Sequence, residues 1–184
     1  MAENTVHDPW ADENVVSGGG LWDGKTVTIL EAKAIVDRIM KREGGELVPF
    51  IDTQTGQPAA RNVLAITGIA DDEEKERRET YSAGGLRPTP DGKLESGDPT
   101  KPTAVHKASE LYKFGSLLRA GGFDTATFYV DGKLDFSSLR GARITFKGED
   151  VMDKNGKAKK NAKGYNQQKF WPRQFVGYRA GAES

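Results

Sequence analysis

The chain of 184 residues carries 27 basic and 27 acidic side chains, two histidines and no cysteine. This length is enough for one domain with a hydrophobic core, and the lack of cysteine excludes disulfides, thiolate nucleophiles and cysteine-bound metals. No apolar run approaches the roughly 20 residues needed to span a bilayer, and the two histidines lack ligand spacing, so we expect no metal, no cofactor and no membrane contact.

The balanced net charge conceals an uneven distribution along the chain. Residues 1–100 hold 11 basic and 19 acidic side chains, whereas residues 101–184 hold 16 basic and 8 acidic ones. The overall balance argues against a protein that coats polyanions with its whole surface. The basic carboxy-terminal half, however, leaves room for one localised anionic ligand.

Residues 1–20 are polar and acidic and end in the sequence SGGG, which is typical of a flexible arm with a hinge. Trp10 either docks on the body or a partner, or is simply an exposed ring. The acidic start is the reverse of a basic signal peptide, so we expect a cytoplasmic protein. Residues 21–184 are then expected to form a single domain.

The first half of this domain predicts several strands and one helix. Residues 26–30 are β-branched, which favours a strand. An apolar stripe at helical spacing follows, formed by Ala32, Ile35, Val36, Ile39 and Met40, with Gly44 placed to end a helix. Further strands are expected at 46–51, 62–70 and 80–83. The charged segment 71–79 is either a helical turn or a hairpin tip.

The second half predicts a long surface loop, a second helix and three strands. Residues 84–103 are rich in Gly, Pro and Asp and are expected to form the loop. The helix covers 107–120 and is closed by Gly121-Gly122. Strands are expected at 125–130, 142–147 and 169–178, the last two facing each other across a basic loop. This pattern predicts a β-rich α+β fold, a small, partly open barrel of the OB type with one or two helices.

Motifs that would indicate catalysis or metal binding lack the neighbouring residues or elements that each of them requires. Residues 19–26, GGLWDGKT, fit the phosphate-loop pattern, but a polar arm precedes them and β-branched residues follow, where a strand and a helix are required. Residues 153–156 begin like a calcium loop, but the glycine comes early and no glutamate closes the loop. No serine lies in a nucleophile elbow. We therefore expect a protein that is not an enzyme.

The most informative segment is Lys154–Arg173, which carries seven basic residues and no acidic one, beside several aromatic rings. Cations that neutralise phosphates, next to rings on which bases stack, are typical of a surface for single-stranded nucleic acid. A solvated lysine-rich hairpin is the alternative interpretation. The expected phosphate contacts are Lys157, Lys159, Lys160, Lys163, Lys169 and Arg173, with Arg143 and Lys147 on the facing strand.

The rings expected to stack on bases are Tyr165, Phe170 and Trp171, while Phe175 is expected in the core. Adjacent residues of a strand face opposite sides, so only one of Phe170 and Trp171 can face the ligand. Because Pro172 favours an edge or strand-end position, we expect Trp171 to remain accessible.

Four segments, LWDGKTVTILEA, KFGSLLRAGGFD, LRGARITFKGED and QKFWPRQFVG, together resemble a group of phage-encoded proteins regarded as single-stranded-DNA-binding proteins of OB type. The likeness covers most of the chain after residue 20. It implies non-enzymatic binding of single-stranded DNA in phage replication or recombination. Many single-strand binders end in an acidic tail that recruits partners, but this chain ends YRAGAES. The acidic amino-terminal arm is therefore the candidate for recruiting replication or recombination proteins.

The alternative function is that of a phage structural protein, such as a capsid-decorating or connector subunit. The acidic arm would then tie neighbouring subunits together, and the basic loop would meet an acidic patch of the next subunit. The sequence predicts neither the oligomeric state nor the order of the strands.

Overall fold

The structure is a computed structural model and describes residues 22–161 and 163–180. The predicted flexible arm, residues 1–20, lies outside the described residues. In the described part, no helix is long and apolar enough to cross a membrane.

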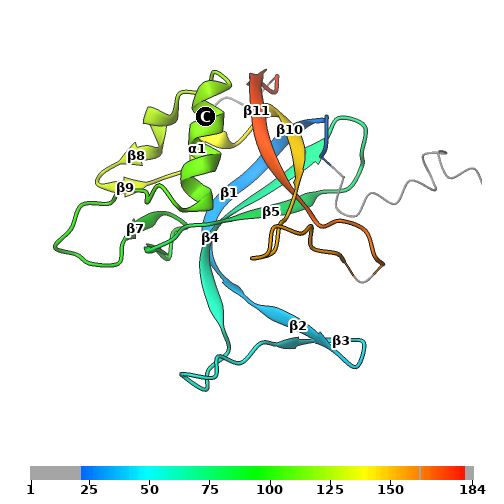
Figure 1. Cartoon of the computed structure of the whole chain (residues 1–184). Coiled ribbons are helices and arrows are strands. Elements are labelled where there is room, and N and C mark those ends of the chain that lie inside the picture. The colour runs from blue at the N-terminus through cyan, green and yellow to red at the C-terminus, as the bar shows by residue number, and fades with distance from the viewer. Residues whose placement is uncertain (1–21, 162, 181–184) are drawn as a thin grey trace, which may run out of the picture.

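The fold is built on one antiparallel sheet of five long strands in the order β11-β10-β1-β4-β5 (Figure 1). These strands are β1 (Thr26–Arg38), β4 (Ala60–Ala70), β5 (Arg77–Ser82), β10 (Ala142–Asp150) and β11 (Gln168–Tyr178). Their apolar side chains, such as Val27, Leu64 and Ile144, are fully buried in one core. The predicted β-rich α+β fold is confirmed.

The predicted helix over residues 32–40 is wrong, because residues 32–38 form the outer half of β1. This half pairs with β4 as far as Arg38 opposite Ala60. A bulge between Ile29 and Glu31 shifts the register, so the core-facing side chains change from odd to even numbers. Val36 is 60% exposed, so the apolar residues at helical spacing do not form one buried face. The β-branched residues there favour a strand.

Shorter elements surround this sheet. The remaining strands are β2 (Met40–Glu43), β3 (Glu46–Pro49), β6 (Leu86–Pro88), β7 (Leu94–Ser96), β8 (Tyr129–Val130) and β9 (Lys133–Leu134), and the 3-10 turns are η1 (Thr125–Phe128) and η2 (Ser137–Leu139). The predicted strand at 46–51 corresponds to β3, which pairs with β2. The predicted loop at 84–103 contains β6 and β7, which join β9 and β8 in a second sheet.

Two ambiguous or mistaken predictions concern turns. Residues 71–76 form the tip of the β4–β5 hairpin, which decides between the two interpretations of the charged segment. The predicted strand at 125–130 is mostly η1, because the carboxylate of Asp124 accepts a hydrogen bond from the Ala126 amide and starts a helical turn.

The α-helix of the described residues is α1 (Glu110–Ala120), close to the prediction of 107–120. Ser109 caps its amino end by accepting a hydrogen bond from the Tyr112 amide at 3.2 Å. At the other end, a Cβ on Gly121 would lie 2.4 Å from the carbonyl oxygen of Arg173. The Gly121 carbonyl also accepts from the Phe175 amide at 2.9 Å. The helix is therefore fixed directly on β11.

The edge strands β5 and β11 are joined by side chains and do not pair as strands. The Tyr81 hydroxyl of β5 donates to the Phe170 carbonyl of β11 at 2.6 Å, and the Phe170 amide donates to the Glu79 carboxylate at 3.2 Å. Helix α1 packs over this junction, with the Phe114 ring 4.4 Å from the Tyr81 ring. The sheet thus curls without closing into a barrel.

Candidate nucleic-acid interface

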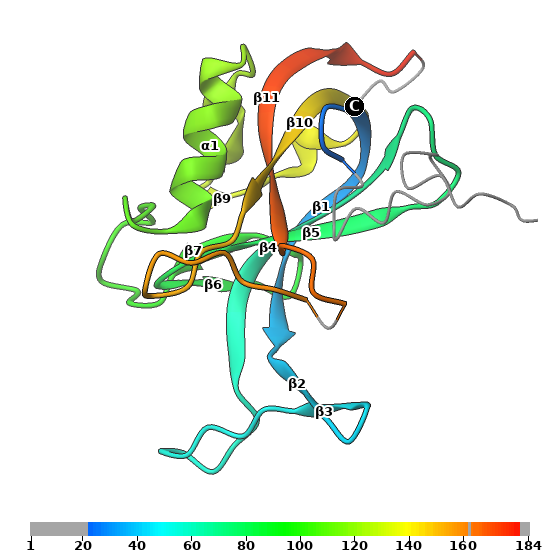
Figure 2. The ribbon, with the colours of Figure 1, turned by 45° about the vertical axis from the view of Figure 1, so that its right-hand side comes forward.

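The basic segment between β10 and β11 forms a folded projection, the finger, defined as residues 151–161 and 163–167 (Figure 2). It contains two turns of the same design. Asp153 accepts hydrogen bonds from the amides two and four residues ahead at 2.8 and 3.0 Å, and Asn161 does the same at 2.9 and 3.1 Å. Gly156 and Gly164, three residues after these side chains, have positive φ. Hydrogen bonds between residues close in sequence therefore stabilise both turns.

Backbone hydrogen bonds hold the two turns together. The Lys159 amide donates to the Val151 carbonyl, and the Gln167 amide donates to the Lys159 carbonyl, each at 2.8 Å. The finger therefore presents its side chains from a hydrogen-bonded frame and not from an unstructured loop.

All five lysines of the finger are exposed, namely Lys154, Lys157, Lys159, Lys160 and Lys163. In the part of the chain that the structure describes, none of the five forms an ion pair, although Lys160 donates to the side-chain oxygen of Asn166. The nearest carboxylates in sequence are occupied by uncharged donors. Asp153 accepts from turn amides, and Asp150 accepts from Asn166 and Gln168 at 2.7 and 3.3 Å. The fold leaves this positive charge unneutralised.

Three other predicted phosphate contacts form ion pairs within the fold. Arg143 pairs with Asp71, Lys169 pairs with Glu110 at 2.8 Å, and Arg173 pairs with Glu149 at 2.7 Å. The Lys169 side chain is only 14% exposed and lies beside the Tyr81 ring, so its ammonium belongs to the β5–β11 junction. The remaining predicted cation, Lys147, is exposed.

The prediction that one ring of Phe170 and Trp171 is accessible is wrong, because both are buried. Phe170 lies in the core, with its ring 6.3 Å from that of Trp22. Trp171 does lie on the opposite face of an edge strand, as expected, but α1 and β5 cover that face. Its ring lies 5.4 Å from Tyr81, and the Lys113 ammonium lies 4.1 Å above it.

Tyr165 is the accessible ring among the three predicted to stack, since it is 45% exposed at the end of the second turn. Phe175 is half-buried and contacts Phe123 edge to face at 5.1 Å, in agreement with its predicted place in the core. The structure thus brings one ring and five lysines together on the finger.

Three groups with shifted pKa values lie at the β5–β11 junction. Burial raises the pKa of Glu79 above its ordinary value, and burial also raises the pKa of Tyr81. Burial alone would raise the pKa of Glu110 too, but hydrogen bonds from Lys169 and the Ser82 amide lower it. Structural contacts commonly shift pKa values in this way. Glu79, Tyr81 and Glu110 thus help to join β5 to β11, the two edge strands that do not pair.

The phosphate-loop resemblance has no structural counterpart in the residues described. Its lysine, Lys25, forms ion pairs with Asp72 at 3.2 Å and Glu73 at 3.1 Å. Trp22 is buried, and Thr26 starts strand β1 where the motif requires a helix. The first residues of the motif, Gly19 and Gly20, lie outside the described residues. Within the described ranges, no group of three or more acidic or histidine side chains could hold a metal ion.

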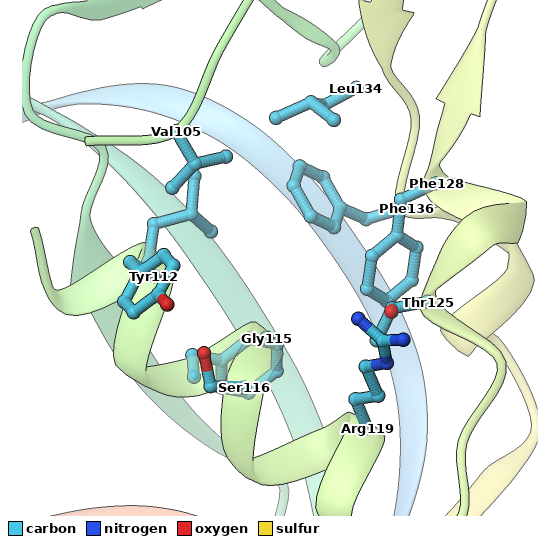
Figure 3. A pocket seen from close by; sticks show the side chains of 11 residues that line it. Val105, Tyr112, Gly115, Ser116, Arg119, Thr125, Phe128, Leu134 and Phe136 are labelled. Carbon is cyan, nitrogen blue, oxygen red and sulfur yellow. The ribbon is translucent and has the colours of Figure 1, made fainter. Parts of the chain in front are cut away.

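A separate cavity of about 330 Å³ lies between α1 and the segment from η1 to β9 (Figure 3). Apolar rings of Phe114, Phe128 and Phe136 line it, together with polar groups of Tyr112 and Arg119. None of the predicted site residues lines this cavity. It therefore does not contribute to the basic surface.

Sequence reasoning missed two features. One is the repeated turn design of the finger, which the spacing of Asp153 to Gly156 and of Asn161 to Gly164 could have revealed. The other is an exposed apolar surface on the β2–β3 hairpin, which was mistaken in part for a helix. Comparison of the chain with protein-family models, curated proteins and solved structures gave no match.

Proposed function

We propose that the protein binds single-stranded DNA without catalysis and that the finger is its main contact. The observation that carries the proposal is the set of five exposed lysines that form no ion pair with any described residue. Lysines of this kind bind phosphates and release the counterions that had neutralised them. Cations elsewhere, such as Lys25 and Arg173, are already paired with carboxylates. A polyanion therefore gains most at the finger.

The exposed Tyr165 ring supports single strands over duplex as the ligand. It lies on the same turn as Lys163. An unpaired base offers an open face for stacking on this ring, whereas the bases of a duplex already stack on one another.

The connectivity of the sheet also supports the proposal. In chain order, β10 and β11 are the fourth and fifth long strands, and the finger joins them. In OB barrels, the loop between the fourth and fifth strands is one of those that bind oligonucleotides. The setting that we propose, phage DNA replication or recombination in the host cytoplasm, rests on the resemblance of the sequence.

Titration of the purified protein with a fluorescent single-stranded oligonucleotide at several salt concentrations tests the proposal. Neutralisation of about four to six phosphates predicts a log-log slope of roughly −3 to −4. A duplex of the same sequence should bind more weakly. Equal affinity for duplex and single strand at every salt concentration would indicate nonspecific attraction to a basic surface, and no binding at low salt would overturn the proposal.

A further inference from the structure

The cavity between α1 and the segment from η1 to β9 is apolar inside and polar at its mouth (Figure 3). The rings of Phe114, Phe128 and Phe136 are at most 5% exposed and form its inner wall. Tyr112 and Arg119 also line the cavity, but their side chains are exposed. Sites for small molecules have this composition, a mostly apolar pocket with a few polar groups that orient the ligand.

Gly115, at the centre of α1, leaves this cavity open. A glycine inside a helix is less favourable than an alanine, because its backbone loses more conformational freedom on folding. No close contact requires this glycine, since a Cβ at Gly115 would meet no atom within 4 Å, whereas a Cβ at Gly121 would meet the Arg173 carbonyl. Packing among the described residues thus gives no reason for the missing side chain. A larger residue at this position would extend into the cavity, so the glycine preserves space for a ligand.

The charge at the mouth of the cavity comes from Arg119. Within the described residues, its guanidinium forms no ion pair and no hydrogen bond. Two carboxylates of the neighbouring segment are engaged elsewhere, because Asp124 caps η1 and Asp135 pairs with Lys93 at 3.8 Å. One unpaired guanidinium beside an apolar cavity favours a ligand with one anionic group. A carboxylate fits this planar group best, through two parallel hydrogen bonds.

The size and lining of the cavity indicate the apolar part of the ligand. An apolar cavity of roughly 150 Å³ holds one benzene ring, so the volume of about 330 Å³ leaves room for about two fused rings. Val105, Leu111 and Leu134 complete the apolar lining. A nucleobase would lose hydrogen bonds at its polar edge in such surroundings, whereas a hydrocarbon ring gains from contact with phenylalanine rings. The cavity therefore favours an aromatic hydrocarbon over a base.

We infer that this cavity binds a small aromatic carboxylate, with its rings among the three phenylalanines and its carboxylate on Arg119. The hydroxyl groups of Tyr112 and Ser116 line the same cavity and form no hydrogen bond with any described residue, so they are available to the ligand. None of the finger lysines lines the cavity, so this inference does not depend on DNA binding.

Titration of the isotope-labelled full chain with naphthylacetate, followed by NMR, tests the site. A ligand of this size is expected to bind with a Kd on the order of 1 mM. The amide signals of Gly115 and Arg119 should shift until they saturate. Naphthylacetamide, which has the same rings without the charge, should bind about tenfold more weakly.

Three results of this titration would overturn the inference. The first is the absence of any shift at about 10 mM naphthylacetate, roughly ten times the expected Kd. The second is equal binding of naphthylacetate and naphthylacetamide, which would remove the role of the guanidinium. The third is equally tight binding of thymidine monophosphate at the same amide signals, which would identify the cavity as a site for a base.

Two variants and one control separate the space for the rings from the charge. Gly115→Leu fills the cavity, so it should abolish binding and raise the melting temperature, because leucine favours a helix and buries apolar surface. Arg119→Gln should weaken naphthylacetate about tenfold and leave naphthylacetamide unaffected. The control, Arg140→Gln, removes an exposed arginine that forms no ion pair with any described residue and does not line the cavity, so it should bind as the wild type does.

Unchanged binding in Gly115→Leu, or an equal loss of binding in Arg119→Gln and Arg140→Gln, would overturn the inference. If Gly115→Leu fails to fold, the comparison of the two ligands on Arg119→Gln decides the matter, because Arg119 is exposed and its replacement leaves the packing of α1 intact. An Arg119→Gln protein that still prefers the acid to the amide would then overturn the site.

Discussion

Removal of the finger's charge separates binding of DNA at this site from general attraction to a basic protein. The variant replaces Lys157, Lys159, Lys160 and Lys163 with alanine. All four side chains are exposed and form no ion pair in the described part of the chain. The two turns depend on Asp153, Asn161 and backbone amides, none of which is altered. We therefore expect the variant to keep its melting temperature.

The loss of affinity follows from counterion release. Each phosphate neutralised on a single strand contributes about 0.7 to the slope of log affinity against log salt, so four lysines account for about 2.8. At a salt concentration of roughly 0.1 M, each contact contributes about fivefold to the affinity. The variant should therefore bind about 100-fold more weakly if three lysines contact phosphates and about 600-fold more weakly if all four do.

Fluorescence anisotropy with a labelled oligothymidine, repeated across a salt series, measures both quantities. A matched control replaces four lysines that are paired with carboxylates, Lys33, Lys93, Lys101 and Lys133. This control removes the same charge from the molecule but should leave the slope nearly unchanged. The reasoning fails if the finger variant keeps the wild-type slope, or if the control lowers the slope as much as the finger variant does.

Three further substitutions test individual side chains. Trp171→Ala should lower the free energy of unfolding by about 3 to 5 kcal/mol in urea denaturation, because the ring is buried under α1. The fraction of this variant that remains folded should bind oligonucleotide as the wild type does. A binding defect without destabilisation would contradict this prediction. Tyr165→Ala should weaken binding by about 1 to 3 kcal/mol without changing the salt slope or the melting temperature, since stacking releases no ions. Burial raises the pKa of Glu79 above 4.5, so the folded state binds this proton more tightly than the unfolded chain, and the resulting stability is lost as pH rises through the folded pKa. Glu79→Gln should flatten this decline of stability in urea denaturation across a pH series, and an unchanged profile would refute the assignment.

The strands of the main sheet could be predicted where local signals agree. The apolar residues of 142–147 alternate along one strand, whereas residues 62–70 contain a short, β-branched apolar run that is buried on both faces. Both patterns are local signals for a strand. The prediction of a helix over 32–40 is wrong for two reasons. The bulge after Ile29 interrupts the alternation of β1, and the apolar residues beyond it continue into an exposed hairpin. The spacing of apolar residues alone does not show whether a residue is buried.

The candidate site could be predicted only in part for a similar reason. The positive charge of the finger can be predicted from the local sequence, because residues 154–173 contain no acidic residue. The accessibility of its rings depends on distant contacts, because Trp171 is covered by α1 and the neighbouring Phe170 is bonded to Tyr81, 89 positions away. The pairing of Arg143 with Asp71 spans 72 positions. Spacing along the chain does not reveal which cations the fold neutralises.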